Sequence, residues 1–348
     1  MAAKPLRGVL IGCGFFSDNH LNAWTRMDGV SLTGVCDLDA AKARSAAARF
    51  GIAGSYTDAS AMLETEKPDF VDIATTVASH RPLVELACAH ARTVICQKPF
   101  AETLADGTAM VAAAERAGAN LIVHENFRWQ RAFTVMKALV DEGRLGKLHF
   151  GRFSFRHGYD NYVNQPYLAE IKRFTIMDVG LHLFDLARHF FGEVETLACT
   201  TQRLNPIVRG EDAFTTLMRH EGGATSVCDC SFYSKRDPDP FPQTVAEIEG
   251  DKGSLILQQD YALTLHTGSG AQTIDAAPAI PEWGAAPWHG VQDSVIRFQA
   301  HAADVARGDA EPRPSGADNL KTLALALAAY DAAEAGATIR MADWREAP

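Results

Sequence analysis

Apolar and polar positions alternate in one way over the first 125 residues and in another way over the rest of the chain. In the first part, short apolar runs are separated by Ala-rich stretches with helical periodicity. The predicted strands are Gly8–Gly12, Leu32–Asp37, Phe70–Ala74, Thr93–Gln97 and Asn120–Glu125. Because strands that alternate with helices of this length are joined by right-handed crossovers, the pattern predicts a parallel sheet.

Start and stop signals delimit the helices between these strands. Asp39 is a typical N-cap residue, and the helix that it begins ends at Gly51. A second helix is predicted over Ser79–Ala91. A third begins at Thr103, in a T-L-A-D segment with the spacing of a capping box, and ends at Gly118.

Beyond residue 125 the pattern indicates consecutive strands with few helices. The predicted helices are Thr134–Glu142, Met177–Phe190, Gln292–Arg307 and Asn319–Ala335. The predicted strands are Leu148–Arg156, Glu195–Gln202, Phe214–Arg219, Ala224–Phe232, Val245–Gly250, Gly253–Leu257 and Ala262–His266. The short turns E-G-G and G-D-K-G favour antiparallel hairpins. We therefore expect an α/β protein in which a parallel domain over residues 1–125 precedes an α/β domain with a large, mostly antiparallel sheet over residues 126–348.

The turn after the first predicted strand carries the candidate cofactor chemistry. Gly12 and Gly14 form a G-x-G turn, through which a pyrophosphate can approach the backbone and the N-terminus of the next helix. Ser17 stands where the usual fingerprint has a third glycine, and it is small enough for close packing of helix on strand. Asp37 ends the second strand, where its carboxylate can accept hydrogen bonds from ribose hydroxyls and repel a 2′-phosphate. The first domain is therefore predicted to be a Rossmann domain that binds NAD rather than NADP.

Ligands of such sheets bind at the carboxyl ends of the strands. We therefore expect cofactor contacts from the glycine turn and from residues that end or follow strands: Gly12, Gly14, Phe15, Phe16, Asp37, Thr75, Thr76, His80, Gln97, Lys98 and Asn126. For His80, a role in capping the following helix is the alternative.

The predicted helix over residues 177–190 carries one polar stripe at i, i+4, i+7 and i+11, formed by Asp178, His182, Asp185 and His189. The stripe is either a solvated face or a buried row that is paired or faces a polar ligand. Solvated faces favour Lys and Glu, and the other sides of this helix are apolar, so we favour the buried row. Gly180 costs helix stability, by about 1 kcal/mol, and is expected to let a bulky ligand approach.

Lys98 follows the fourth predicted strand within the segment Gln97-Lys98-Pro99. A lysine at the carboxyl end of a parallel strand is expected to point toward the nicotinamide. Pro99 favours an extended backbone at Lys98. The alternative is a surface lysine without a role in the chemistry.

Taken together, these motifs resemble those of the Gfo/Idh/MocA oxidoreductase family, named after glucose–fructose oxidoreductase, inositol dehydrogenase and a rhizopine catabolism protein. Its pattern is G-x-G-x-x-[GA], then E-K-P, then D-x-G-x-H-x-x-D, and the last motif stands intact at residues 178–185. The resemblance covers essentially the whole chain. Gln97 replaces the family's Glu, and Thr76-Val77 replace a frequent Pro-Pro. Four segments further resemble bacterial aldose dehydrogenases: His124–Gln130, Arg152–Arg156, Gln165–Leu168 and Ser315–Thr322.

The resemblance implies NAD-dependent oxidation of a carbohydrate hydroxyl, at C1 of an aldose such as a pentose, with a lactone as product. The implied catalytic residues are Lys98, Asp178 and His182. His182 is the expected base, and Lys98 is expected to stabilise the developing alkoxide, although the two roles are interchangeable. The expected substrate contacts are Lys98, Asn126, Arg156, Tyr159, Asp178 and His182, with ordinary structural roles as the alternative for Asn126, Arg156 and Tyr159.

Three other functions fit the same scaffold: a polyol or inositol dehydrogenase, an NAD-dependent glycoside hydrolase, and an NAD-binding regulator without catalysis. Pocket shape decides which hydroxyl is attacked, so the sequence leaves the first alternative open. The intact Lys98, Asp178 and His182 argue against the regulator.

Composition narrows the possible partners. The net charge is −10 and no basic block occurs, which argues against nucleic acid as a partner. No apolar run approaches the roughly 20 residues that span a bilayer. The seven cysteines form no C-x-x-C pair, so we expect reduced thiols in the cytoplasm and no metal site. The resemblance implies a homodimer or homotetramer, with the second domain serving both substrate binding and oligomerisation.

Overall fold

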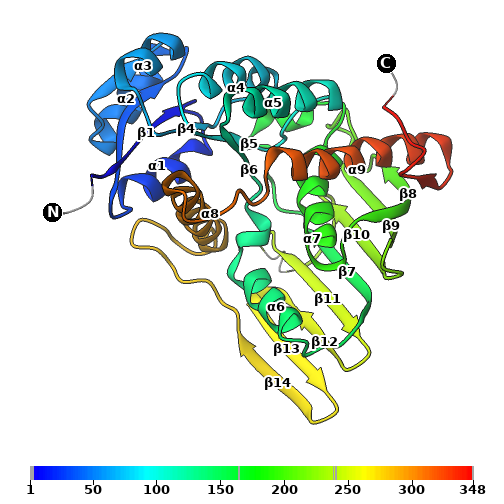
Figure 1. Ribbon diagram of the computed structural model, residues 1–348. Helices are drawn as coiled ribbons and strands as arrows, with labels where there is room; N and C mark the ends of the chain where they lie inside the picture. The colour runs from blue at the N-terminus through cyan, green and yellow to red at the C-terminus, as the bar shows by residue number, and fades with distance from the viewer. Residues whose placement is uncertain (1–3, 164, 238, 240, 347–348) are drawn as a thin grey trace. The chain divides into compact units, whose positions relative to one another are not determined.

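Figure 1 shows a computed structural model of the chain, which describes residues 4–163, 165–237, 239 and 241–346. The chain forms two compact units. The first comprises the chain up to Asn126 together with residues 281–285 and 291–323, and the second comprises residues 127–280, 286–290 and the chain from Ala324 onward. This packing differs from the expected division at residue 125, because most of helix α8 (His289–Arg307) and the start of helix α9 (Gly316–Ala335) belong to the first unit.

The first unit contains the predicted parallel sheet. Its six strands pair in the order β3-β2-β1-β4-β5-β6, and every pair is parallel. The strands are β1 (Leu6–Ile11), β2 (Val30–Cys36), β3 (Gly54–Tyr56), β4 (Phe70–Ile73), β5 (Thr93–Gln97) and β6 (Asn120–His124). This order and direction confirm the Rossmann sheet.

Helices alternate with these strands: α1 (Ser17–Thr25), α2 (Ala40–Phe50), α3 (Ala59–Glu66), α4 (His80–Cys88) and α5 (Leu104–Ala117). The predicted caps are confirmed, since the side chain of Asp39 accepts hydrogen bonds at the start of α2 and that of Thr103 does so at α5. Gly51 and Gly118 end the same two helices in the left-handed conformation. The sequence pattern did not predict β3 and α3, which lie between the predicted elements.

The second unit contains a nine-stranded sheet in the order β14-β13-β12-β11-β7-β10-β9-β8-β15. The strands are β7 (Leu148–Arg156), β8 (Val194–Gln202), β9 (Ala213–His220), β10 (Thr225–Ser231), β11 (Thr244–Gly250), β12 (Gly253–Leu257), β13 (Ala262–Thr267), β14 (Gly270–Asp275) and β15 (Ile339–Arg340). Both predicted hairpins, β9–β10 and β11–β12, are antiparallel. β7 and β10 pair in parallel, so the sheet is mostly antiparallel, as expected.

Helix α7 (Leu181–Phe191) packs on β7 and β10 (Figure 1). It is preceded by a π-helical turn, η4 (Ile176–Gly180), and α6 (Arg131–Asp141) is the other α-helix that lies wholly within the described part of this unit. The Sγ atom of Cys228 lies 3.4 Å from the Leu183 carbonyl oxygen, so this face of β10 faces α7. Short 3₁₀ turns lie between these elements: η1 (Val77–Ser79), η2 (Phe127–Trp129), η3 (Pro166–Ala169) and η5 (Gln259–Tyr261).

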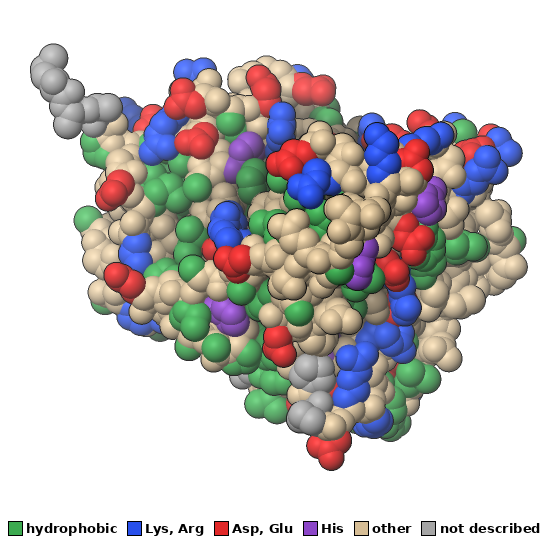
Figure 2. Space-filling model, turned by 90° about the horizontal axis from the view of Figure 1, so that it is seen from below, with side chains coloured by type: hydrophobic (Ala, Val, Ile, Leu, Met, Phe, Trp, Pro, Cys, Tyr) green, Lys and Arg blue, Asp and Glu red, His purple; other side chains and the backbone are tan. Residues whose placement is uncertain are grey.

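The surface carries charges of both signs. On the face seen in Figure 2, Lys and Arg side chains are interspersed with Asp and Glu. All seven cysteines are free thiols. Among the described helices, none combines the length and the apolar character needed to cross a bilayer.

Candidate active site

The glycine turn joins the ends of three strands of the first unit. Gly12 has a φ of +100°, and a Cβ atom there would lie 2.5 Å from the Ala74 carbonyl oxygen, beyond β4. The Gly12 N–H donates to the Cys36 carbonyl oxygen, at the end of β2. Only glycine fits this conformation and this close approach. A Cβ atom at Gly14, in contrast, would meet no atom within 4 Å, so the backbone there borders open space that a ligand can enter.

Helix α1 begins directly after this turn, and no side chain caps its N-terminus. Such an N-terminus favours a phosphate, because its first N–H groups and the helix dipole both attract an anion. Asp18 would weaken this preference, but Arg49 of α2 neutralises it with two hydrogen bonds of 2.7 and 2.8 Å. Ser17 donates to the Gly14 carbonyl oxygen over 2.6 Å and thereby holds the turn against the helix.

Asp37 is fixed beside the turn. One carboxylate oxygen accepts from the Cys13 N–H at 2.8 Å, and the other accepts from the Asp39 N–H at 2.9 Å. Each oxygen keeps a lone pair for a further donor, such as a ribose hydroxyl. Burial, followed by the charge of Asp37, raises the pKa of Cys13 to about 12, so the thiol beside this carboxylate stays neutral. The glycine turn, α1 and Asp37 therefore fit a bound dinucleotide.

The loop after β4 contains the next predicted cofactor residues. Ser79 donates to the side chain of Thr75 or to the carbonyl oxygen of Thr76, each at 2.8 Å. The ring of His80 is buried, and its two nitrogens lie 3.2 Å from the carbonyl oxygens of Phe100 and Thr75. His80 makes no side-chain cap. Its geometry favours holding these two loops in place over a direct contact with the cofactor.

Polar side chains lie near the ends of β5 and β6. Gln97 accepts from the Lys98 N–H at 2.7 Å, and Lys98 is half-buried. The Asn126 amide donates to Ser294 of α8 at 2.7 Å. Asn126 is thus fixed by a residue that lies 168 positions further along the chain. A local sequence pattern cannot show such a contact.

In the second unit, the segment that carries Asp178 is anchored by a buried acid. The carboxylate of Glu211 accepts from the backbone N–H groups of Phe174 and Ile176, at 3.0–3.2 Å, and from the Tyr330 hydroxyl at 2.7 Å. Burial raises the pKa of Glu211, and these donors oppose that rise. Glu211 therefore fixes the start of η4, the turn that positions Asp178.

The residues of the predicted polar stripe have different surroundings in the structure. Asp178 lies in the π-helical turn and is half-buried, whereas His182 and Asp185 lie further along the chain, in α7. Asp185 is fully buried in a bidentate ion pair with Arg128 and is structural. His182 is nearly buried, and its ring stacks on Phe127 with centroids 3.8 Å apart. Of the stripe, Asp178 and His182 stay as candidates for the chemistry.

One sequence-based expectation is corrected in this unit, and two others stay predictions. A Cβ atom at Gly180 would lie 3.1 Å from the Phe214 ring, so this glycine makes room for core packing and not for a ligand. Arg156 lies on the sheet face opposite α7, where it bonds Asp229 at 3.3 Å, and its predicted sugar contact stays a prediction. Tyr159 is half-exposed and packs edge-on against Phe241, which leaves its predicted contact open.

His157 is a buried imidazole near this site that the sequence analysis did not select. Burial lowers its pKa to about 4, and the negative charges of Asp239 and Asp178 oppose that change. The ring packs against Phe155 and Phe232. A neutral His157 therefore lies within the electrostatic reach of Asp178.

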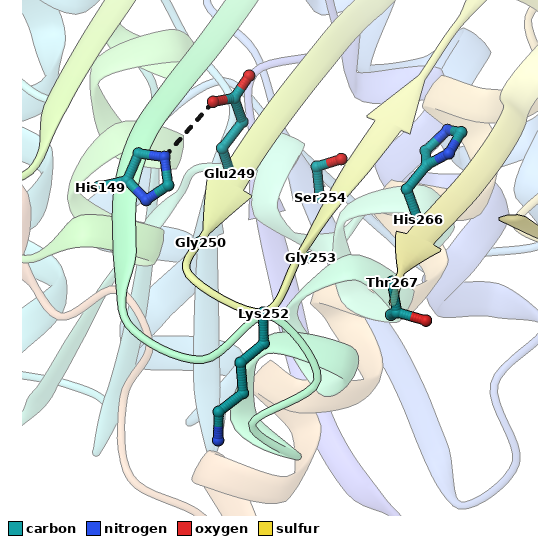
Figure 3. Close-up of a pocket in the computed structure, with 8 residues that line it drawn as sticks. All are labelled: His149, Glu249, Gly250, Lys252, Gly253, Ser254, His266 and Thr267. Carbon is teal, nitrogen blue, oxygen red and sulfur yellow. Dashed lines mark ion pairs between the residues drawn. The ribbon is translucent and has the colours of Figure 1, made fainter. Parts of the chain in front are cut away.

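The hollow in Figure 3 lies elsewhere in the second unit. It has a volume of about 310 Å³, opens at the β11–β12 turn and at the end of β13, and contains the His149–Glu249 ion pair. None of its lining residues belongs to the predicted site. Within the described residues, no three His, Cys, Asp or Glu side chains are arranged to hold a metal ion.

Comparison with protein families gives two matches. The family described as an oxidoreductase family with an NAD-binding Rossmann fold, Gfo/Idh/MocA, matches residues 6–125. The C-terminal domain of the same family matches residues 133–256.

Individual relatives match over nearly the whole length. A D-apiose dehydrogenase of Paraburkholderia graminis is 49% identical, over 97% of this chain and 90% of that protein. A D-apiose dehydrogenase of Rhizobium rhizogenes is 46% identical, over 97% of this chain and 98% of that protein. The crystal structure of an oxidoreductase from Agrobacterium radiobacter, in complex with NAD+, L-tartaric acid and magnesium, is 45% identical with a TM-score of 0.94, over 97% of this chain and 98% of that one. Inositol dehydrogenases are more distant, at 27% and 29% identity.

The lowered pKa of His157 predicts an acid-sensitive contribution to stability. Between pH 6.5 and about 4 the unfolded chain binds a proton at this histidine and the folded chain does not, so stability falls as the pH drops through this window. A change from 6.5 to about 4 corresponds to about 3 kcal/mol. His157→Gln should therefore lose less free energy of unfolding between pH 7 and pH 4.5 than the wild type, as measured by urea denaturation.

His149, which is exposed on the surface, supplies the control. His149→Gln should keep the pH dependence of the wild type. An identical slope in His157→Gln and in the wild type would show that His157 is not the group responsible.

Proposed function

The chain belongs to the Gfo/Idh/MocA oxidoreductase family, and from that premise we propose that it is an NAD-dependent dehydrogenase that oxidises C1 of an aldose to a lactone. The observation that carries the substrate class is the similarity to two D-apiose dehydrogenases, which extends over nearly the whole chain. D-Apiose is therefore the proposed substrate. An inositol or another polyol is the second candidate, favoured by the more distant inositol dehydrogenases.

The first unit is the proposed cofactor-binding part. When bound, NAD supplies the acceptor for the hydride that leaves the sugar. The glycine turn and the N-terminus of α1 hold the pyrophosphate, and Asp37 accepts from the adenosine ribose. Gly12, Gly14, Phe15, Phe16, Thr75, Thr76, Lys98 and Asn126 remain the proposed cofactor contacts. His80 and Gln97, which the sequence also places near the cofactor, hold the loops around it, Gln97 by accepting from the Lys98 N–H.

Proton handling is the proposed task of Lys98, Asp178 and His182. The hydroxyl proton must leave the sugar as the C1 hydride departs, and the imidazole of His182 is the proposed acceptor. The ammonium of Lys98 stabilises negative charge on the reacting oxygen. Asp178, on the turn anchored by Glu211, orients a sugar hydroxyl. Asn126 is a further proposed sugar contact, as is Tyr159.

The open face of the large sheet supports a homo-oligomer, which we propose to be a dimer or a tetramer. Cys228 faces α7, so Asp229 lies on the other face, where it bonds Arg152, Ser154 and Arg156 at 2.8–3.3 Å. On the same face of the neighbouring strand β9, Leu217 is 53% exposed. A large sheet with one uncovered face that carries apolar side chains favours a partner sheet. The seven free thiols fit the proposed location in the reducing cytoplasm.

Asp37→Ala removes the proposed ribose acceptor and the charge that repels a 2′-phosphate. We expect the dissociation constant for NAD to rise about tenfold, because one hydrogen bond to a charged group is lost. The dissociation constant for NADP should fall, because the repelling charge is gone. Isothermal titration calorimetry with both nucleotides measures the change. An unaltered ratio of the two constants would remove Asp37 from the ribose site.

The proposed activity is tested by following NADH formation with D-apiose, L-arabinose, D-xylose, D-glucose and myo-inositol. D-Apiose should give the highest kcat/KM. Lys98→Met and His182→Gln should each lower kcat by roughly 10²–10⁴-fold while NAD still binds. A preference for myo-inositol would favour the second candidate, and an unchanged kcat in either variant would remove that residue from the chemistry.

Leu217→Asp places a charge on the open sheet face and should dissociate the oligomer, since burying an unpaired carboxylate in an interface is unfavourable. Size-exclusion chromatography with light scattering measures the mass. Ile207→Asp is the matched control, because Ile207 is 57% exposed and lies in a loop. A wild-type chain that is monomeric, or a Leu217→Asp variant with the wild-type mass, would contradict the proposed interface.

A further inference from the structure

A chain of polar side chains runs through the interior of the first unit to the backbone of Lys98. Asp72 of β4 is fully buried. One of its carboxylate oxygens lies 2.8 Å from His20 Nδ1 and accepts a hydrogen bond from Trp24 Nε1 at 2.7 Å. The other ring nitrogen of His20, Nε2, lies 3.3 Å from Gln97 Nε2. Gln97 Oε1 in turn accepts from the Lys98 N–H at 2.7 Å.

The last of these bonds fixes the direction of all the others. A backbone N–H can only donate, so the Gln97 side chain must present its oxygen to Lys98 and its NH₂ group to His20. His20 Nε2 must then accept. The proton of a neutral imidazole is left on Nδ1, which donates to Asp72. The reversed amide would place its NH₂ group against the Lys98 N–H, so that two donors would face each other.

The packing around His20 holds this arrangement in place. The ring of His124 stacks on that of His20 with centroids 4.1 Å apart, and Phe16 meets it edge-on at 5.6 Å. Phe298 of α8 packs on the other side of His124, at 4.2 Å. Within the described residues, these contacts place the titratable groups Asp72 and His124 against His20. Because His20, His124, Phe298 and Asp72 are fully buried, the His20 ring has little room to turn.

We propose that Asp72, His20 and Gln97 are positioning residues that fix the Lys98 backbone, and that Gln97 holds His20 as the neutral Nδ1–H tautomer. Gln97 spans the two parts of this arrangement, since it bonds both the imidazole and the N–H group of the residue that carries the ammonium. The functional part rests on the role proposed above for Lys98, whereas the proton arrangement stands without it.

An acid at position 97 would change the protonation of His20. Both oxygens of a carboxylate accept, so Gln97→Glu requires a proton on His20 Nε2 as well as on Nδ1. His20 becomes an imidazolium between two carboxylates. The three side chains then carry a net charge of −1, as they do in the wild type with only Asp72 charged.

Solid-state ¹⁵N NMR of the full chain with labelled histidine reads these states directly. In the wild type at pH 7.5, His20 should show the two widely separated ring shifts of a neutral Nδ1–H imidazole, and in Gln97→Glu the two similar shifts of an imidazolium. His20→Asn assigns the signals by their loss. Where that variant does not fold, neutron diffraction from wild-type crystals locates the same protons. An Nε2–H tautomer or an imidazolium in the wild type would overturn the proposal, as would a neutral His20 in Gln97→Glu.

Kinetics separate positioning from direct contact with the cofactor. Gln97→Met keeps the volume of the side chain and breaks both of its bonds, so Lys98 is displaced. We expect kcat for D-apiose to fall roughly 10²-fold with the dissociation constant for NAD within about threefold of the wild type. Gln299→Met is the matched control, because Gln299 is buried against α1, where its side-chain amide pairs with the His20 carbonyl oxygen and the Trp24 indole N–H. The kcat of this variant should stay within about threefold of the wild type.

The outcomes distinguish this inference from the proposed function. If no sugar is oxidised by the wild type, the proposed activity fails and the NMR result still decides the proton arrangement. If the wild type is active and Gln97→Met keeps its kcat, or loses NAD affinity instead, the positioning role is wrong.

Discussion

The candidate cofactor site depends on one close approach, that of the Gly12 backbone to the carbonyl oxygen of Ala74. A side chain at Gly12 would collide with that oxygen at 2.5 Å, and the hydrogen bond from Gly12 to Cys36 ties the same turn to β2. The ends of β1, β2 and β4 are thereby held together. Asp37, one residue beyond β2, comes within hydrogen-bond distance of the Cys13 N–H as a result. A turn that was one carbon atom larger would separate the glycine backbone from the carboxylate, and the two would no longer serve one dinucleotide.

Three of the buried acids, Asp72, Asp185 and Glu211, play different parts, and their partners explain the difference. Asp185 is paired with Arg128, and such a pair fixes a helix to a neighbouring turn. Glu211 accepts from backbone N–H groups and a tyrosine hydroxyl, so it fixes the backbone in front of Asp178. Asp72 accepts from His20 and Trp24 and begins the chain that ends at Lys98. In each case a buried carboxylate is tolerated because donors replace the water it has lost, and the donors determine what the acid positions.

Periodicity and turn residues predicted the parallel sheet, the glycine turn, the cap at Asp39 and both hairpins, because each depends on neighbours in the sequence. The sequence pattern did not predict the strands β3, β14 and β15, which are short or lie at a sheet edge, where alternation of apolar and polar residues is weak. The spacing of Asp178 and His182 predicts one continuous helix, and the π-helical turn over Ile176–Gly180 cannot be read from that spacing. The partners of Asp185, Asn126 and His20 lie more than fifty residues away, so only the folded chain brings them together.

The central claim is that a hydride passes from C1 of an aldose to the nicotinamide of NAD. The most direct measurement uses D-apiose that carries deuterium at C1, incubated with the enzyme and NAD, with the reduced cofactor analysed by mass spectrometry. If the hydride comes from C1, each molecule of reduced cofactor carries one deuterium. Reduced cofactor that forms from this sugar without deuterium would contradict the account.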